Sequence, residues 1–261
     1  MSLVISSTTN PKVKDIIQLL TKSQERKSRG LCIIEGAREI NRALASNWVP
    51  KELWQLEGSD VPLQSASFPN YYKVTPKVFQ KLAYRNTTEC AVAVFAIPAS
   101  GMHEYHKLLE SAKCLLVLEG IEKPGNLGAC LRTACAAGVD AVVLADSAVD
   151  PYSPNVIRNS TGALFEIPLI SASSEELVSV FNNTQRKVYV TNLHENADSM
   201  FHIKWPNKCA IVLGKEAVGL SKNWTASNFD NIIIPMEGET IDSLNVSVSA
   251  ALLMYHWRSQ Q

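Results

Sequence analysis

The sequence predicts an α/β protein with a mostly parallel sheet and helices on both faces, preceded by a smaller α/β domain. Short apolar segments rich in Val, Ile and Leu recur through the carboxy-terminal half, as in strands that are buried on both faces. Helical patterns separate these segments, which indicates parallel strands joined by crossover helices. The Pro- and Gly-containing stretch at residues 98–101 interrupts the pattern and indicates a domain boundary.

The amino-terminal domain is expected over residues 1–98, followed by a linker over residues 99–108. In chain order, its expected elements are a helix after Asn10-Pro11, a strand at 31–35, a helix near 37–46 and a late apolar run at 90–97. Helices that alternate with short apolar runs are typical of a separate α/β unit.

The carboxy-terminal domain is expected over residues 109–261. Strands are predicted, each from a continuous apolar run, at 114–118, 141–145, 165–169, 188–192, 210–213 and 231–235. Helices are predicted near 126–137, 174–183 and 217–227, and the chain closes on an apolar segment after Ser243. Strands and helices that alternate at this length favour a doubly wound sheet.

The composition excludes several classes of protein. With 46% hydrophobic residues, the 261-residue chain can bury one large or two modest cores. No apolar run approaches the roughly 18 to 20 residues that span a bilayer, and the amino terminus lacks the apolar core of a signal peptide. The six cysteines are scattered without a CxxC pair, which indicates reduced thiols rather than disulfides or a zinc site. We therefore expect a cytoplasmic protein without a membrane partner.

Motifs for common cofactors and for metals are absent. Neither G-x-G-x-x-G nor G-x-x-x-x-G-K-[ST] occurs, so NAD or ATP chemistry loses support. The Gly-x-Ser-x-Gly elbow of many hydrolases is absent, so a hydrolase loses support. The five histidines lack the spacing of metal ligands, and no metal site is expected.

The zero net charge hides an uneven distribution. Residues 1–107 hold 14 of the 25 Lys and Arg residues but 9 of the 25 Asp and Glu residues, so the remainder of the chain is acidic. Lys and Arg near the amino terminus could contact phosphate groups. A solvated helix surface explains the same surplus equally well. The candidate phosphate-binding residues are Lys12, Lys22, Arg26, Lys27, Arg29 and Arg38.

Three loops after predicted strands combine glycine with polar side chains. They read EGIEKPGNLGACLRTACAAG after Leu118, GKEAVGLS after Leu213 and PMEGETIDSLN after Ile234. In a parallel α/β sheet, ligands bind outside the carboxyl ends of the strands. Glycine lets the backbone approach a ligand closely, so these loops are the expected functional site.

Individual side chains in these loops have alternative explanations. Arg132 needs an anionic partner, which could be a ligand or a structural pair with Glu119 or Glu122. Glu216 lies near an expected helix amino terminus, where a carboxylate could act in the site or simply cap the helix. Residues 243–250 alternate polar and apolar like a strand. A helical stripe is also present, formed by Leu244, Val248, Ala251, Leu252 and Tyr255.

The three loops together resemble the signature of the SpoU family of RNA ribose methyltransferases, within the SPOUT superfamily. The similar segments are NLGACLRTA at 126–134, IVLGKEAVGLS at 211–221 and IPMEGETIDSLNVSVSAALLMY at 234–255. The amino-terminal domain resembles the RNA substrate-binding domain of many such enzymes, which is similar to small ribosomal proteins. The resemblance implies methyl transfer from S-adenosylmethionine to a ribose 2′-hydroxyl of RNA, a homodimer and a carboxy-terminal trefoil knot.

The resemblance also assigns roles to residues. Positions linked to catalysis or to the shape of the site are Asn126, Arg132, Glu216, Ser243 and Asn245. Positions whose backbone or neighbours hold the cofactor are Leu213, Gly214, Ile234, Met236 and Leu244. The family favours a helix after residue 243, with Ser243 as its cap and Asn245 on its first turn. Activation of the 2′-hydroxyl is assigned to Arg132, but a guanidinium is a poor proton acceptor, so we favour an orienting role.

Several functions fit the resemblance. Ribosomal RNA is favoured slightly over transfer RNA as the substrate. A transfer RNA ribose methyltransferase is the first alternative, and a non-catalytic RNA-binding ribosome-assembly factor with the same fold is the second. An oxidoreductase on a conventional nucleotide-binding sheet is disfavoured, because its glycine motif is absent.

Overall fold

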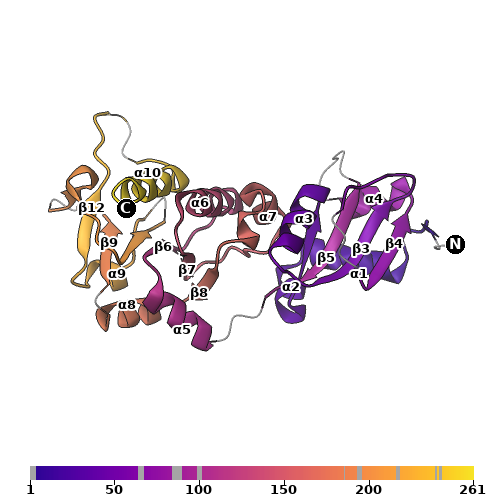
Figure 1. Ribbon diagram of the computed structural model, residues 1–261, viewed down its shortest axis with the longest axis horizontal. Helices are drawn as coiled ribbons and strands as arrows, with labels where there is room; N and C mark the ends of the chain where they lie inside the picture. Colours follow the sequence, from indigo (N-terminus) through magenta and orange to yellow (C-terminus); the bar gives the residue numbers. More distant parts are fainter. Residues whose placement is uncertain are drawn as a thin grey trace. The chain divides into compact units, whose positions relative to one another are not determined.

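The computed structural model describes residues 4–63, 68–83, 90–98, 102–184, 186–192, 196–215, 218–238, 240 and 243–261. The chain divides into two compact units (Figure 1). Unit 1 consists of Met1–Ala99 together with Asp150–Phe165, and unit 2 of Ser100–Val149 together with Glu166–Gln261. A single boundary between 1–98 and 109–261 does not anticipate that residues 150–165 pack with the amino-terminal unit.

Unit 1 is built on a mixed sheet of five described strands in the order β1-β4-β3-β5-β2. The strands are β1 (Val4–Ile5), β2 (Leu31–Glu35), β3 (Pro50–Leu56), β4 (Asn70–Val74) and β5 (Ala91–Ala96). β1, β4 and β3 are parallel to one another, whereas β5 is antiparallel to both β3 and β2. The expected strand at 31–35 and the late apolar run are confirmed, and β1, β3 and β4 were not predicted.

Helices complete unit 1. They are α1 (Pro11–Thr21), α2 (Ser23–Arg29), α3 (Ala37–Ala45), α4 (Pro76–Leu82) and α7 (Pro154–Ser160), followed by a 3-10 turn at Ala163–Phe165. The side chain of Asn10 accepts a hydrogen bond from the Lys12 backbone, so Asn10 caps α1 directly before Pro11. The apolar face of α1 packs with Trp54 and Val92 of the sheet in one buried cluster.

Unit 2 is built on a wholly parallel sheet of described strands in the order β10-β12-β9-β11-β6-β7-β8. The strands are β6 (Cys114–Glu119), β7 (Ala141–Ala145), β8 (Leu169–Ala172), β9 (Lys187–Thr191), β10 (Asp198–Ser199), β11 (Cys209–Leu213) and β12 (Asp230–Ile233). All residues of β6, β7 and β11 are buried. Strands that are buried on both faces need helices on both faces of the sheet. This burial confirms the predicted doubly wound architecture.

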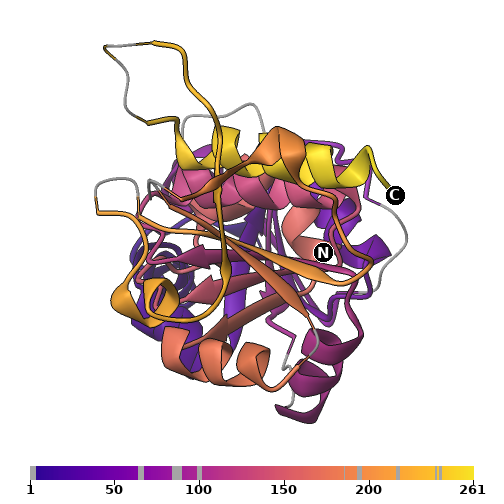
Figure 2. The same cartoon turned by 90° about the vertical axis from the view of Figure 1, so that its left-hand side faces the viewer.

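The helices lie on opposite faces of this sheet (Figures 1 and 2). They are α5 (Met102–Ser111), α6 (Pro124–Ala137), α8 (Ser174–Asn182), α9 (Lys222–Thr225) and α10 (Val246–Arg258). α6 and α10 lie side by side on one face, and α5, α8 and α9 cover the other. Leu115 and Val117 of β6 pack with Leu177 and Trp224 on the α8 and α9 side. The trefoil knot implied by the family resemblance stays a prediction.

Three of the expected elements were wrong in detail. Phe165 ends a 3-10 turn, and β8 begins only at Leu169, because Pro168 has no backbone N–H for a sheet hydrogen bond. Only residues 222–225 of the expected helix at 217–227 form a described helix. The expected linker at 99–108 instead contains the first residues of α5. None of the described helices is long and apolar enough to cross a bilayer.

Candidate functional site

A cavity of about 470 Å³ opens at the carboxyl ends of β9, β11 and β12. Its lining residues are Thr191, Asn192, Leu213, Gly214, Lys215, Val218, Gly219, Ile232, Ile233, Ile234, Met236, Ser243, Leu244, Val246 and Ser249. The walls combine aliphatic side chains with backbone groups and a few hydroxyl and amide groups. Such a composition suits a small molecule that has both an apolar and a polar part.

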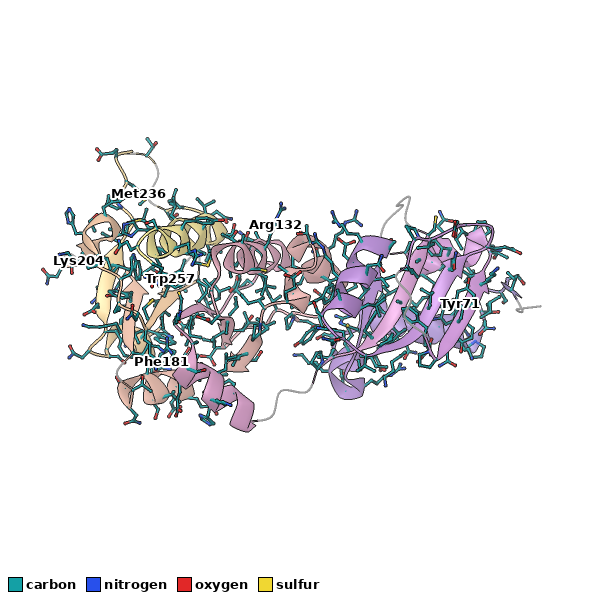
Figure 3. The ribbon with its side chains drawn as sticks, viewed as in Figure 1. Tyr71, Arg132, Phe181, Lys204, Met236 and Trp257 are labelled. Carbon is teal, nitrogen blue, oxygen red and sulfur yellow. The ribbon has the colours of Figure 1, made fainter. Side chains whose placement is uncertain are left out.

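The five predicted cofactor-binding residues all line this single cavity. Leu213 and Gly214 follow β11, Ile234 and Met236 follow β12, and Leu244 precedes α10. Ser243, predicted as a catalytic residue, lines it as well. Two of the three loops, those after β11 and β12, therefore contribute to one cavity, and no residue of the loop after β6 lines it. Figure 3 shows Met236 on the long segment that leads from β12 to α10.

The carboxyl end of β9 was missed as a part of the cavity. Thr191 donates a hydrogen bond from Oγ1 to the Val212 carbonyl, and Asn192 donates from Nδ2 to Asn231 Oδ1. These bonds join β9 to its two neighbouring strands. A polar Thr-Asn pair directly after an apolar run was the available signal, because the same rule located the other loops.

The loop after β11 is closed by its own backbone. Lys215 N donates to Gly219 O at 3.1 Å, and Gly219 N donates to Lys215 O at 2.9 Å. A side chain at Gly214 would overlap the backbone of Gly219 and Leu220, with a β-carbon 2.6 Å from the Gly219 carbonyl oxygen. Glycine is thus required at 214 for the loop to close beside the cavity. Glu216, predicted as catalytic, lies outside the described residues.

Glu119, at the end of β6, anchors the segment that follows this loop. Its carboxylate is buried and accepts hydrogen bonds from Ser221 N at 2.7 Å and from Ser174 Oγ at 2.8 Å. Trp224 Nε1 donates to the same Ser174 hydroxyl at 3.1 Å. The carboxylate therefore has a structural role, and it is not the partner of Arg132.

Asn245 joins the two helices on one face of the sheet. Its Oδ1 accepts a hydrogen bond from Ser247 N at 2.9 Å and thereby caps α10. Its Nδ2 donates to Asn126 Oδ1 on the first turn of α6 at 3.2 Å. The expectation that residues after 243 form a helix is confirmed, but Ser243 as its cap was wrong. Asn245 takes that position because α10 begins two residues later, at Val246.

Arg132 lies on the exposed side of α6 (Figure 3). Among the residues that the structure describes, no carboxylate lies within salt-bridge distance of its guanidinium. Neither Glu119 nor Glu122 pairs with it, so the structural alternative loses support. A charged side chain without an acidic partner is free to meet an anionic ligand.

Cys130 lies on the same helix and does not act as a nucleophile. Its thiol is buried, and burial raises the pKa of this group to about 12. A thiol with that pKa stays protonated at neutral pH, and only the thiolate is nucleophilic. Cys130 therefore has a packing role in α6.

The six basic residues predicted to bind phosphate differ in their surroundings. Lys22 and Lys27 are exposed on or beside α2, and Lys12 Nζ donates to the Tyr72 hydroxyl at 2.6 Å. Arg29 forms a two-point pair with Asp15, and Arg38 pairs with Glu39.

Arg26 differs from the other five, because it is buried. Its side chain forms an ion pair with Asp150. A buried, neutralised guanidinium cannot reach a phosphate on the surface, so Arg26 does not belong to an RNA-binding face.

Comparison with known proteins agrees with this geometry. The model of the SpoU rRNA Methylase family matches residues 113–255, and the model of the MRM3-like substrate binding domain matches residues 10–93. The chain is 31% identical over 254 residues to the 23S rRNA (guanosine(2553)-2′-O)-methyltransferase RlmP of Bacillus subtilis. That alignment covers 97% of this chain and 98% of the relative.

Solved structures are similar over nearly the whole chain. An RNA 2′-O ribose methyltransferase is 37% identical with a TM-score of 0.84, and the similarity covers 99% of each chain. An AdoMet-bound rRNA methyltransferase from Sinorhizobium meliloti is 26% identical with a TM-score of 0.87, covering 99% of this chain and 98% of that one.

Proposed function

This chain belongs to the SpoU rRNA methylase family, and we propose that it transfers a methyl group from S-adenosylmethionine to a ribose 2′-hydroxyl of ribosomal RNA. The single observation that carries the proposal is that the residues of the second and third signature segments line one cavity at the sheet's carboxyl edge. The similarity to an AdoMet-bound structure over 99% of this chain supports the identity of the cofactor.

The cavity suits S-adenosylmethionine in both size and composition. Its volume of about 470 Å³ lies within the range of small-molecule sites. Exposed apolar side chains such as Met236 and Leu244 would contact an adenine ring, and the backbone groups beside Gly214 and Ile234 would hydrogen-bond its edge. When bound, the cofactor would supply a methyl group on a sulfonium, with a neutral thioether as the leaving group. The ribose oxygen would gain this methyl and release its proton to water.

The chain's own contribution is alignment of the substrate. The hydrogen bond between Asn245 and Asn126 fixes the start of α10 against the first turn of α6, the helix that carries Arg132. Holding two reactants in a reactive orientation contributes a large part of a catalysed rate. We assign Arg132 to orienting the 2′-hydroxyl and neutralising a neighbouring phosphate, because a guanidinium stays protonated and is therefore a poor base.

An assay of methyl transfer tests the function. Labelled methyl from S-adenosylmethionine is expected in ribosomal RNA and not in transfer RNA, and mapping of the modified nucleotide would identify the target. Label only in transfer RNA would support the first alternative. Cofactor binding without transfer to either RNA would indicate a non-catalytic RNA-binding protein.

The role of Arg132 needs its own variant. Arg132→Lys retains the charge but loses the fork geometry of a guanidinium, so kcat is expected to fall by about tenfold or more. Arg258→Lys, an exposed position at the end of α10, provides the matched control. Near-normal turnover of Arg132→Lys would show that charge alone suffices.

Residues 1–98 are proposed to bind the RNA substrate, supported by the match to a substrate-binding domain and by the exposed Lys22 and Lys27. Replacing both lysines with Ala is expected to weaken RNA binding and to leave cofactor binding unchanged. Deletion of residues 1–98 is a poorer test of RNA binding, because it also removes the part of unit 1 with which residues 150–165 pack.

A homodimer is proposed from the outer face of α10. Val248, Leu252 and Tyr255 lie along this helix at helical spacing and are all exposed, as is Leu244 just before it. A contiguous apolar stripe on a charged protein surface indicates an interface. A second copy of the chain is the proposed partner. A cytoplasmic location, expected from the scattered cysteines of the sequence, stays a prediction.

A further inference from the structure

The side chain of Lys215 lies across the backbone of Gly120. Gly120 follows β6 with a φ of 58°, in the left-handed region that favours glycine. A β-carbon at this position would overlap Cε of Lys215 and lie 2.9 Å from its Cγ and 3.1 Å from its Cδ. Because Gly120 has no side chain, the aliphatic part of the Lys215 side chain (its stem) can lie directly against the Gly120 backbone.

The lysine is fixed at its base as well as along its stem. Two backbone hydrogen bonds with Gly219 hold Lys215 at the mouth of the cofactor cavity. β11 and β6 are neighbouring parallel strands, so a stem that starts after β11 and crosses Gly120 points from β11 toward β6. The end of the lysine side chain therefore lies near Gly120, directly after the carboxyl end of β6.

No described acidic group neutralises this ammonium. Among the residues that the structure describes, no carboxylate lies within salt-bridge distance of Lys215. The nearby Glu119 is buried and bonded to Ser174 and Ser221. Lys215 itself is exposed. An exposed ammonium beside a binding cavity is suited to a mobile anionic ligand.

We propose that Lys215 is a substrate-contacting residue whose ammonium binds a phosphate of the RNA strand next to the methylated nucleotide. This proposal rests on the proposed function. The position of the stem favours the RNA over the cofactor, because the stem lies against Gly120, which does not line the cavity and begins the segment that leads to α6, the helix with Asn126 and Arg132. Lysine binds phosphate as a compact point charge and needs no fixed fork geometry.

The test compares Lys215→Met with Lys215→Arg in the full-length protein. Met retains an apolar stem over Gly120 but removes the charge, and Arg retains the charge. The probe is unmodified 23S ribosomal RNA transcribed in vitro, with binding measured over a range of salt concentrations. Lys215→Met is expected to lower RNA affinity by about three- to tenfold and to reduce the slope of log K against log salt by about 0.7 to 0.9.

Lys208→Met is the matched control. Lys208 is an exposed lysine directly before the amino end of β11, at the opposite edge of the sheet. Its replacement is expected to leave the salt slope unchanged. Lys215→Arg is expected to retain the wild-type slope, and the Kd for S-adenosylmethionine is expected to stay within about twofold of wild type in all variants, since no RNA phosphate takes part in cofactor binding.

A second variant displaces the same ammonium group while Lys215 itself is unchanged. Gly120→Ala displaces the stem and is expected to reproduce much of the loss in RNA affinity, with little further loss when combined with Lys215→Met. Gly138→Ala controls for backbone strain, because Gly138 also has a positive φ, of 75°, but has no atom within 4 Å of the added carbon.

Three results separate the possible failures. An unchanged salt slope in Lys215→Met would overturn the proposal. A raised Kd for S-adenosylmethionine with an unchanged slope would overturn it too and would assign the ammonium to the cofactor carboxylate. Absence of methyl transfer by the wild-type protein would instead contradict the proposed function, while the salt slopes for RNA binding would still test Lys215.

Discussion

The Nη2 atom of Arg26 lies 2.6 Å from Oδ2 of Asp150, although 124 positions separate the two residues. Both side chains are buried, with exposed fractions of 5% and 8%. Arg26 also donates to the carbonyl oxygens of Leu19 and Leu20 near the end of α1. One guanidinium thus ties α1 and α2 to the segment at residues 150–165.

Arg26→Ala is expected to lower the free energy of unfolding by about 3 to 5 kcal/mol, because it leaves the Asp150 carboxylate buried without a counter-charge. Urea denaturation measures the loss. Arg29→Ala is the matched control, because Arg29 pairs with Asp15 on the surface, where loss of a pair costs less than about 1 kcal/mol. Equal losses for the two variants would contradict a special role for the buried pair.

Arg26 also shows why the sequence indicated some features and not others. Arg26, Lys27 and Arg29 look alike as a cluster of positive charges, and only the fold distinguishes the buried member from the exposed ones. Its partner Asp150 lies in a segment whose assignment to unit 1 follows from long-range packing. Local sequence patterns contain no information on such a pair.

The strands of the parallel sheet were predictable where they are buried on both faces and apolar throughout, as in β7 and β11. β3 and β4 were missed because each has an exposed side and contains Lys, Glu, Gln or Tyr. α7 was missed although Ser153-Pro154 is a readable start signal, with the Ser153 hydroxyl accepting from Val156 N.

Residues of the second and third motifs line one cavity, because each of these motifs follows a strand of the same parallel sheet and the carboxyl ends of such strands share one edge. The contact between the Lys215 side chain and Gly120 could not be predicted, because it depends on the pairing of β11 with β6. The cap of α10 was predicted at Ser243 but is Asn245. Local sequence could not distinguish the two, because both residue types suit the N-cap position.

Gly214→Ala is expected to raise the Kd for S-adenosylmethionine by about tenfold or more, because the added carbon would overlap the Gly219 and Leu220 backbone and open the loop beside the cavity. Isothermal titration calorimetry measures the affinity. Gly238→Ala is the control, since an added carbon at 238 would have no atom within 4 Å. An unchanged Kd for Gly214→Ala would show that the loop conformation does not determine cofactor binding.

Two variants of Asn245 separate its structural role from its role in the site. Asn245→Ser retains an oxygen that can cap α10 but cannot reach Asn126, so stability is expected to fall by less than about 0.5 kcal/mol while methyl transfer falls strongly. Asn245→Ala removes both functions and is expected to lose about 1 kcal/mol of stability in addition. Full activity of Asn245→Ser would show that the link to Asn126 is dispensable.

The capping box of α8 predicts a pH-dependent contribution to stability. Backbone and side-chain hydrogen bonds from Ser173 lower the pKa of Glu176 from its usual 4.5. Because the folded pKa is lowered, the stabilisation is present above pH 4.5 and is lost as pH falls through the lowered value.

Glu176→Ala is therefore expected to be less stable than wild type at neutral pH, with a difference that shrinks in acid. Thermal unfolding over a pH series measures the difference. Glu175→Ala, at the preceding position of the same turn, lies outside the capping box and shares only the helix-dipole effect. A constant difference between wild type and Glu176→Ala at all pH values would contradict the role of the carboxylate.

Leu252→Glu tests the proposed dimer. Leu252 lies in the middle of the exposed apolar stripe on α10, between Val248 and Tyr255, with 42% of its surface exposed. A carboxylate at this position would be buried without a counter-charge if a second copy covered the stripe, so the variant is expected to be monomeric by light scattering at concentrations where wild type is dimeric. Asn223→Glu adds the same charge at an exposed position on α9, on the opposite face of the sheet, and is expected to leave the dimer intact.

A monomeric wild-type protein would contradict the proposed dimer, and a dimeric Leu252→Glu would place the interface elsewhere. Unchanged thermal stability of both variants below the dimerisation concentration would exclude misfolding as the cause, because the stripe contacts solvent in the single chain.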